Sequence, residues 1–283
     1  MSDEPTERAR VERWHRGLGR SLPTRAVPRF DRRFAVVTEE LGEPGATFPA
    51  YVVTPRDREP TRTLVYVHGG GFMAPMDPFH VRYATRLATA LDARVVLPTY
   101  PLAPEHTWRD SFEPLAALVA RWADAPGGAV LAGDSAGGGY ALALALALRD
   151  RGGPQPSHLV LHAPWVDLTM SAPGTVERDA VDPWLFLGKA SAYAAWWAGS
   201  PDDLARPEVS PGLADLDGLP LGLMIYGTRD LLAPGCDLLA RRAADAGWDL
   251  TSVVEPDAIH VFGIMPALPE ARRAFRRTVA WLR

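Results

Sequence analysis

The chain has 283 residues, 47% of them hydrophobic, and a formal net charge of −4. This length is typical of one large domain or of one domain with a small appendage, and the composition excludes a disordered chain. The acidic balance gives no indication of a nucleic-acid binder. The single cysteine, Cys236, excludes an intrachain disulfide and a cysteine-based metal cluster.

The N-terminal region, residues 1–28, is polar and rich in arginine. It lacks the apolar region of a secretion signal, and the longest uncharged apolar run of the chain, Ala136–Leu148, is too short to span a bilayer. We therefore predict a cytoplasmic protein without a membrane span. Within this region four apolar residues recur at helical spacing and predict an amphipathic helix: Val11, Trp14, Leu18 and Leu22.

Two strands rich in Val, Phe and Tyr are predicted next, joined by a short turn that favours an antiparallel pair. From residue 63 onward, short apolar runs typical of buried strands alternate with helical stretches. This alternation predicts a mostly parallel central sheet with helices on both faces. The predicted strands cover 34–38, 47–54, 63–67, 94–97, 129–132, 158–162, 221–226 and 251–255, and the helices cover 79–91, 112–123, 136–150, 190–198, 235–246 and 270–282.

The segment 136–150 carries an alternating Ala-Leu run whose period of two is that of a strand. Both residue types are strong helix formers and neither is β-branched, so we predict a buried helix. The preceding turn reads Gly133-Asp134-Ser135-Ala136-Gly137 and matches G-x-S-x-G between a strand and a helix. In that context Ser135 is a candidate nucleophile, and the N–H of Ala136 points to the same space. A glycine-serine loop without function is the alternative.

A second glycine motif, His68-Gly69-Gly70-Gly71-Phe72, follows the predicted strand 63–67. Consecutive glycines let backbone N–H groups point into a cavity without obstruction by side chains. We predict that the N–H groups of Gly70 and Gly71, together with that of Ala136, form an oxyanion hole. A flexible hinge is the alternative, and for His68 we favour a structural role in orienting the loop.

A nucleophilic serine needs a base, and His260 is the histidine that follows the last predicted strand. The chain order Ser…Asp…His then requires an acid between the two, at the end of a strand. Asp230, directly after the predicted strand 221–226, is the best candidate. Asp237 falls inside the next helix, and Asp257 is too close in sequence to His260 for an easy approach. The alternative role for Asp230 is that of a helix cap.

Three motifs then occur in order along the chain: HGGGF at 68–72, YPLAPEH at 100–106 and GDSAGG at 133–138. Together they resemble those of the hormone-sensitive-lipase-like esterases, the GDXG group. The resemblance spans about 60–265. It implies the α/β-hydrolase fold, with a mostly parallel sheet flanked by helices and a small helical cap. Pro101 departs from the arginine of many relatives, which leaves the chemistry intact and affects substrate preference.

The cap that the resemblance implies fits two places, residues 1–28 and an insertion at about 168–205, and leaves 29–283 as the catalytic domain. The predicted N-terminal helix would then pack on the body as half of a lid, which we favour over binding to an anionic membrane. Aromatic residues crowd the insertion, and we expect most of them to pack between cap and body, with one or two facing substrate: Trp184, Phe186, Tyr193, Trp196 and Trp197.

The residues and the resemblance together predict a serine carboxylesterase acting on short- to medium-chain esters through an acyl-enzyme. Ser135, Asp230 and His260 would form its triad, and it would need no metal or organic cofactor. An amidase or deacetylase of the same fold and a non-catalytic small-molecule binder are the alternatives. The expected binding partner is a small-molecule ester, the substrate. The natural substrate and the oligomeric state, a homodimer included, stay open.

Overall fold

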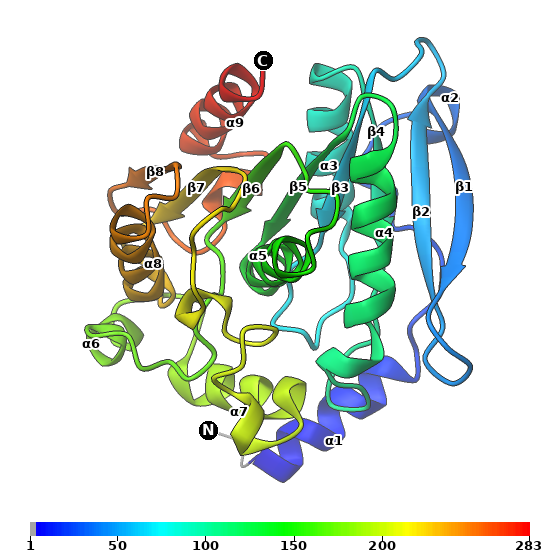
Figure 1. Cartoon of the computed structure of the whole chain (residues 1–283). Helices are drawn as coiled ribbons and strands as arrows, with labels where there is room; N and C mark the ends of the chain where they lie inside the picture. Colours follow the sequence, from blue (N-terminus) through cyan, green and yellow to red (C-terminus); the bar gives the residue numbers. More distant parts are fainter. Residues whose placement is uncertain (1–3) are drawn as a thin grey trace.

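The computed structural model describes residues 4–283. Within them lies an eight-stranded sheet with the strand order β1-β2-β4-β3-β5-β6-β7-β8 (Figure 1). Strand β2 runs antiparallel to both of its neighbours, and the remaining pairs are parallel. The strands are β1 (Phe34–Leu41), β2 (Phe48–Pro55), β3 (Arg62–Val67), β4 (Ala93–Pro98), β5 (Ala129–Asp134), β6 (His158–His162), β7 (Leu221–Gly227) and β8 (Leu250–Glu255).

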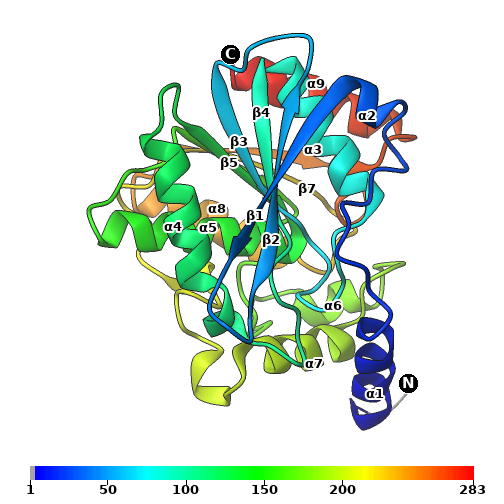
Figure 2. The ribbon, with the colours of Figure 1, turned by 90° about the vertical axis from the view of Figure 1, so that its right-hand side faces the viewer.

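Helices cover both faces of this sheet (Figure 2). On one face lie α3 (Pro78–Ala90) and α9 (Pro269–Trp281), and on the other lie α4 (Phe112–Asp124), α5 (Ser135–Asp150) and α8 (Ala233–Asp245). The central strands are covered twice, so β5 is buried along its whole length and β3 at every position after Arg62. The predicted mostly parallel sheet with an antiparallel start is confirmed, as is the buried helix of the Ala-Leu run.

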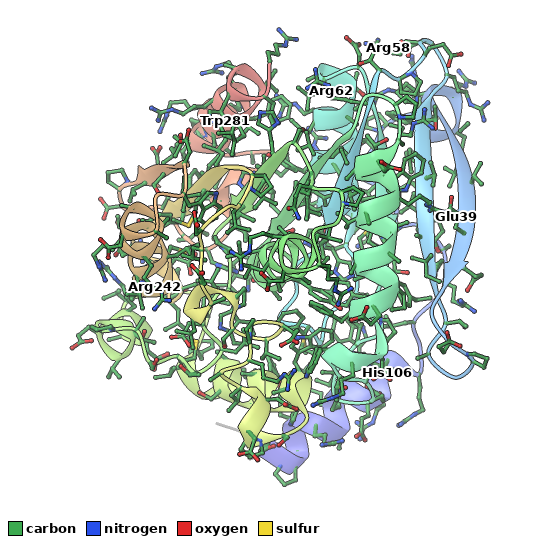
Figure 3. The ribbon with its side chains drawn as sticks, viewed as in Figure 1. Glu39, Arg58, Arg62, His106, Arg242 and Trp281 are labelled. Carbon is green, nitrogen blue, oxygen red and sulfur yellow. The ribbon has the colours of Figure 1, made fainter. Side chains whose placement is uncertain are left out.

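Three helices gather at the end of the sheet where the parallel strands finish (Figure 1). They are α1 (Glu4–His15), α6 (Thr175–Asp179) and α7 (Leu187–Ala198). Figure 3 marks the two ends of the molecule: His106 lies near these helices, and Arg58 and Arg62 lie at the opposite end of the sheet. A short additional helix, α2 (Phe30–Arg33), leads into β1.

The predicted N-terminal stripe is partly wrong. Helix α1 ends at His15, so Leu18 and Leu22 lie outside it, beyond Gly17, which favours an end to the helix. Trp14 is 41% exposed, while Val11 is fully buried. The buried side of α1 is therefore carried by Val11 and the carboxylate of Glu7 rather than by four apolar residues. No helix within residues 4–283 is long and apolar enough to cross a membrane.

Candidate active site

Ser135 stands at the turn between β5 and α5 with a φ of 51°, a conformation that costs free energy for a residue other than glycine. The flanking glycines make this turn sterically feasible. A Cβ at Gly133 would lie 2.3 Å from the carbonyl oxygen of Gly137, and a Cβ at Gly137 would lie 2.2 Å from that of His68. The turn thus places Ser135 at the carboxyl end of the central strands, where the sequence motif predicts it.

The structure brings Ser135, His260 and Asp230 together from three separate turns. The hydroxyl Oγ of Ser135 lies 2.8 Å from Nε2 of His260, and Nδ1 of His260 lies 2.8 Å from Oδ2 of Asp230. A carboxylate only accepts, so Nδ1 carries the proton and Nε2 is free to accept from the serine hydroxyl. Asp230 is fully buried, and its Oδ1 accepts a further hydrogen bond of 2.8 Å from the N–H of Leu232.

The two rival acids lie elsewhere. Asp237 sits in α8, half-buried, and accepts the hydroxyl proton of Tyr226. Asp257 is exposed in the turn after β8, and its N–H bonds to the hydroxyl of Thr228. Neither carboxylate has a hydrogen bond with His260, because the loop after β7 occupies that position with Asp230.

Opposing effects set the protonation of His260. Burial by itself lowers the pKa of this imidazole, since the charged form loses its hydration. The carboxylate of Asp230, helped by those of Asp134 and Asp182, outweighs burial and raises the pKa of His260 above its usual value. Asp230 therefore stabilises the protonated form of the His260 ring.

The glycine loop after β3 lies beside the serine, with positive φ angles of 115° at Gly70 and 61° at Gly71. Among the described residues no acceptor lies within hydrogen-bond reach of either N–H group. The N–H of Ala136 belongs to the first turn of α5, where backbone donors have no partner within the helix. Three donors are thus available near Ser135 for an anionic oxygen.

A buried carboxylate holds this loop in place. Oδ1 of Asp134 accepts the hydroxyl proton of Tyr66 at 2.6 Å and the N–H of Gly69 at 3.1 Å, and its Oδ2 lies 3.3 Å from Nε2 of His80. Burial alone would raise the pKa of Asp134, but His80 and Tyr66 lower it to about 2. The ring of His68 donates to the carbonyl of Gly69, which agrees with the structural role expected for this histidine.

Aromatic residues of the segment 168–205 contact the glycine loop. Phe72 of the glycine loop stacks on Trp197 of α7, with ring centroids 4.3 Å apart and 5° between planes. The ring of Tyr193 contacts Gly71, where an added Cβ would lie 3.3 Å from Cδ2 of Tyr193. Trp196 and Trp197 are buried, as expected for packing, whereas Trp184 and Phe186 are half exposed.

Helix α1 is tied to α7 by polar contacts over the glycine loop. The hydroxyl of Tyr193 donates to Oε1 of Glu7 at 2.6 Å, and Nε1 of Trp196 donates to Oε1 of Glu4 at 3.0 Å. Lys189 lies 3.5 Å from the same oxygen of Glu7. The hydrogen bonds from Arg10 and Tyr193 outweigh burial and lower the pKa of Glu7 to about 2, so Glu7 is a carboxylate at physiological pH.

Sequence reasoning missed Asp182, which lies buried within the segment 168–205 and accepts the N–H of Leu231. The Asp182-Pro183 pair is a turn signal, since the side chain of an aspartate before proline caps following N–H groups. That signal explains the local turn and says nothing of a contact with the acid-bearing loop. Within residues 4–283 no group of three or more His, Cys, Asp or Glu side chains is placed to hold a metal ion.

Comparisons with known proteins identify the family of the chain. A family profile described as α/β hydrolase fold matches residues 64–264. An acetyl-hydrolase of Streptomyces hygroscopicus is 33% identical over 230 residues, which cover 80% of this chain and 77% of that protein. The carboxylesterase NlhH of Mycobacterium tuberculosis is 30% identical over 232 residues, 76% of this chain and 72% of that protein.

A solved structure extends the match to the whole chain. The crystal structure of an esterase from the bacterial hormone-sensitive lipase family superposes with a TM-score of 0.79 at 30% identity, covering 100% of this chain and 98% of that one. The fold and the resemblance expected from the sequence are confirmed: the chain belongs to the hormone-sensitive-lipase-like family of α/β hydrolases.

Proposed function

We propose that this protein is a serine carboxylesterase with Ser135, His260 and Asp230 as its triad. The observation that carries the proposal is the continuous line of hydrogen bonds from Ser135 to Asp230, beside N–H donors of Gly70 and Gly71 that have no acceptor among the described residues. A non-catalytic binder would need neither the strained serine nor the buried acid. Esterases and hydrolases of carboxylic esters among the relatives support the same class.

The geometry supports a two-step reaction. Oγ of Ser135 attacks the ester carbonyl while Nε2 of His260 takes its proton, and the N–H groups of Gly70, Gly71 and Ala136 stabilise the oxyanion. The imidazolium, held by Asp230, then protonates the departing alcohol and leaves an acyl-serine. Water, deprotonated by His260, attacks the acyl-serine, and the carboxylic acid departs as the proton returns to Oγ.

Short- to medium-chain esters are the substrates that we propose. Tyr193 lies against Gly71, and Trp197 holds Phe72, so aromatic rings of the cap crowd the space next to the donors. The relative named an acetyl-hydrolase supports a small acyl group. An amide or an acetylated amine would use the same groups, and turnover of p-nitrophenyl esters against matched aryl amides separates these activities.

We also propose that residues 1–28 and about 168–205 form the cap, with 29–283 as the catalytic domain into which the second segment is inserted. The contacts of Glu7 with Tyr193 and Lys189 support a lid, since they join α1 to the helix that covers Gly71. The early end of α1 weakens the alternative of a membrane-bound helix, because Leu18 and Leu22 lie outside the helix and leave it without a continuous apolar face. A lid excludes water and contributes contacts to substrate.

Ser135→Ala is expected to lose esterase activity while the protein stays folded, because no other group replaces the attacking oxygen. In comparable enzymes the loss of a triad member lowers kcat on the order of 10⁴–10⁶-fold. The wild type should also gain the mass of one phosphonyl group at Ser135 when treated with a phosphonofluoridate, and the variant should not. A variant within tenfold of wild type would contradict the assignment of the nucleophile.

Asp230→Asn is expected to fold and bind substrate but to turn over roughly 10⁴-fold more slowly, since the amide no longer holds the required tautomer of His260. Asp237→Asn is the matched control, because the same change there removes a negative charge while an amide oxygen can still accept from the Tyr226 hydroxyl. The measurement is kcat on p-nitrophenyl acetate for both variants. The opposite order of the two activities would assign the acid to Asp237.

Activity is expected to fall as the pH drops through the pKa of His260, because only the neutral ring accepts the proton of Ser135. Since Asp230 raises that pKa, the midpoint of the acid limb in kcat/KM should lie above about 6.5. The pKa of His80 is also raised, by Asp134, so His80→Gln is the control. An acid limb that disappears in His80→Gln would assign the titration to His80.

Glu7→Ala is expected to change the selectivity among acyl chains, because Tyr193 then loses its anchor over Gly71. Glu12→Ala, on the same helix, removes only an exposed ion pair with Arg8, which contributes little to stability, and should keep the wild-type profile. The ratio of kcat/KM for acetate and hexanoate p-nitrophenyl esters is the readout. Equal ratios in both variants and the wild type would show that α1 is not part of a lid.

A further inference from the structure

One carboxylate of the proposed cap insertion, that of Asp182, bonds both within the insertion and to the loop that carries Asp230. Asp182 precedes α7 in the chain and is buried, with 6% of its surface exposed. Its Oδ1 accepts the N–H groups of Trp184 at 2.7 Å and Leu185 at 2.9 Å. These bonds close the turn that begins at Asp182, and they fix the backbone from which the Trp184 side chain projects.

The second oxygen of Asp182 reaches the loop that carries the proposed catalytic acid. Its Oδ2 accepts the N–H of Leu231 at 2.7 Å. The next N–H along the chain, that of Leu232, bonds to Oδ1 of Asp230 itself. Two successive backbone donors of this loop are therefore satisfied by carboxylates, one from the cap insertion and one from the triad.

The same turn also reaches the proposed base. The ring of Trp184 lies edge-on to the imidazole of His260, with centroids 5.7 Å apart and 67° between planes. Trp184 is half exposed, so solvent or a bound molecule reaches its other side. Asp182 thus holds the backbone beside both partners of the hydrogen bond between Asp230 and His260.

We propose that Asp182 is a positioning residue that couples the cap insertion to the triad, holding the Asp230 loop and the Trp184 ring in the geometry that His260 needs. This inference rests on the proposed esterase function. No contact with substrate is required of Asp182, which acts through Leu231 and Trp184. A displacement of the cap insertion would move the acid-bearing loop with it, because the carboxylate bonds to both.

The charge of Asp182 adds a second effect. Three carboxylates from different elements act on His260: Asp230 from the loop after β7, Asp134 from the end of β5, and Asp182 from the cap insertion. Burial lowers the pKa of His260 and these three raise it. Removal of the charge at Asp182 should therefore lower the pKa of His260 and move the acid limb of activity to lower pH.

Asp182→Asn tests the proposal in the full-length protein. The amide has one acceptor oxygen and one donor group, so it cannot bond both to Leu231 and to the turn at Trp184. Asp179→Asn is the matched control: Asp179 lies in the same insertion and its Oδ1 accepts the N–H of Leu187, at the start of α7. Each variant loses a carboxylate that accepts backbone N–H groups within the insertion. Of the two, only Asp182 also bonds to the loop that carries Asp230.

We expect kcat of Asp182→Asn on p-nitrophenyl acetate to fall roughly 10- to 100-fold, the order of loss that a small misplacement of catalytic groups causes. Its acid limb should shift to lower pH by a fraction of a unit, while Asp179→Asn keeps the wild-type kcat and pH profile. Equal effects of the two variants, or an unshifted acid limb with wild-type kcat in Asp182→Asn, would overturn the proposal.

Asp182→Glu separates geometry from charge and serves if the asparagine variant does not fold. The longer side chain keeps the charge and displaces both oxygens, so kcat should fall while the acid limb stays in place. A wild-type kcat in Asp182→Glu would also overturn the proposal that Asp182 couples the cap insertion to the triad. An inactive wild type that a phosphonofluoridate does not label at Ser135 would instead count against the proposed esterase function, so the two failures are distinguishable.

Discussion

The candidate active site depends on one close backbone contact between β3 and α5. A Cβ at Gly137 would lie 2.2 Å from the carbonyl oxygens of both Val67 and His68, so only glycine permits the approach. Through this contact the first turn of α5, with Ser135 and the N–H of Ala136, lies beside the glycine loop that follows β3. The positive φ of Ser135 persists because packed neighbours on both sides leave the turn no relaxed alternative.

Buried carboxylates stabilise the arrangement that this contact creates. Asp134, Asp230 and Asp182 are each at most 6% exposed, and a buried charge without partners would cost several kcal/mol. Each of the three is satisfied by donors from other segments: Asp134 by Tyr66, Gly69 and His80, Asp230 by His260, and Asp182 by Leu231. Because every donor is needed, the carboxylates order the loops that they join.

The segment 168–205, proposed as a cap insertion, contacts the same loops. Three aromatic rings of the insertion contact groups proposed for the reaction or their neighbours. Trp197 stacks on Phe72, Tyr193 lies against Gly71, and Trp184 lies edge-on to His260. Aromatic rings bring a large apolar area with few rotatable bonds, so they define the walls of a site at a small cost in conformational entropy. Residues 168–205 therefore contribute walls to the candidate site.

The amino-acid sequence alone predicts the sheet, the helices that flank it and the turns that carry Ser135, Gly70, Gly71, Asp230 and His260. These features are recognised locally: each strand and helix has its own pattern of apolar residues, and the motifs at 68–72 and 133–137 are short runs in which glycine recurs. The Ala-Leu run was predictable for the same reason, since helix propensity acts within the segment itself.

Which residues far apart in sequence come into contact depends on the tertiary fold. No pattern within residues 168–205 indicates that Asp182 bonds to Leu231, about fifty residues further on. Nor does any pattern there indicate that Glu7, in α1, anchors Tyr193. Apolar spacing predicts a helix through Leu22, but α1 ends at His15, before Gly17. Its buried side includes the carboxylate of Glu7, which pairs with Arg10 and with side chains of α7, and apolar spacing carries no record of such partners. Contacts between side chains far apart in sequence depend on how the elements pack, and packing is a property of the folded chain as a whole.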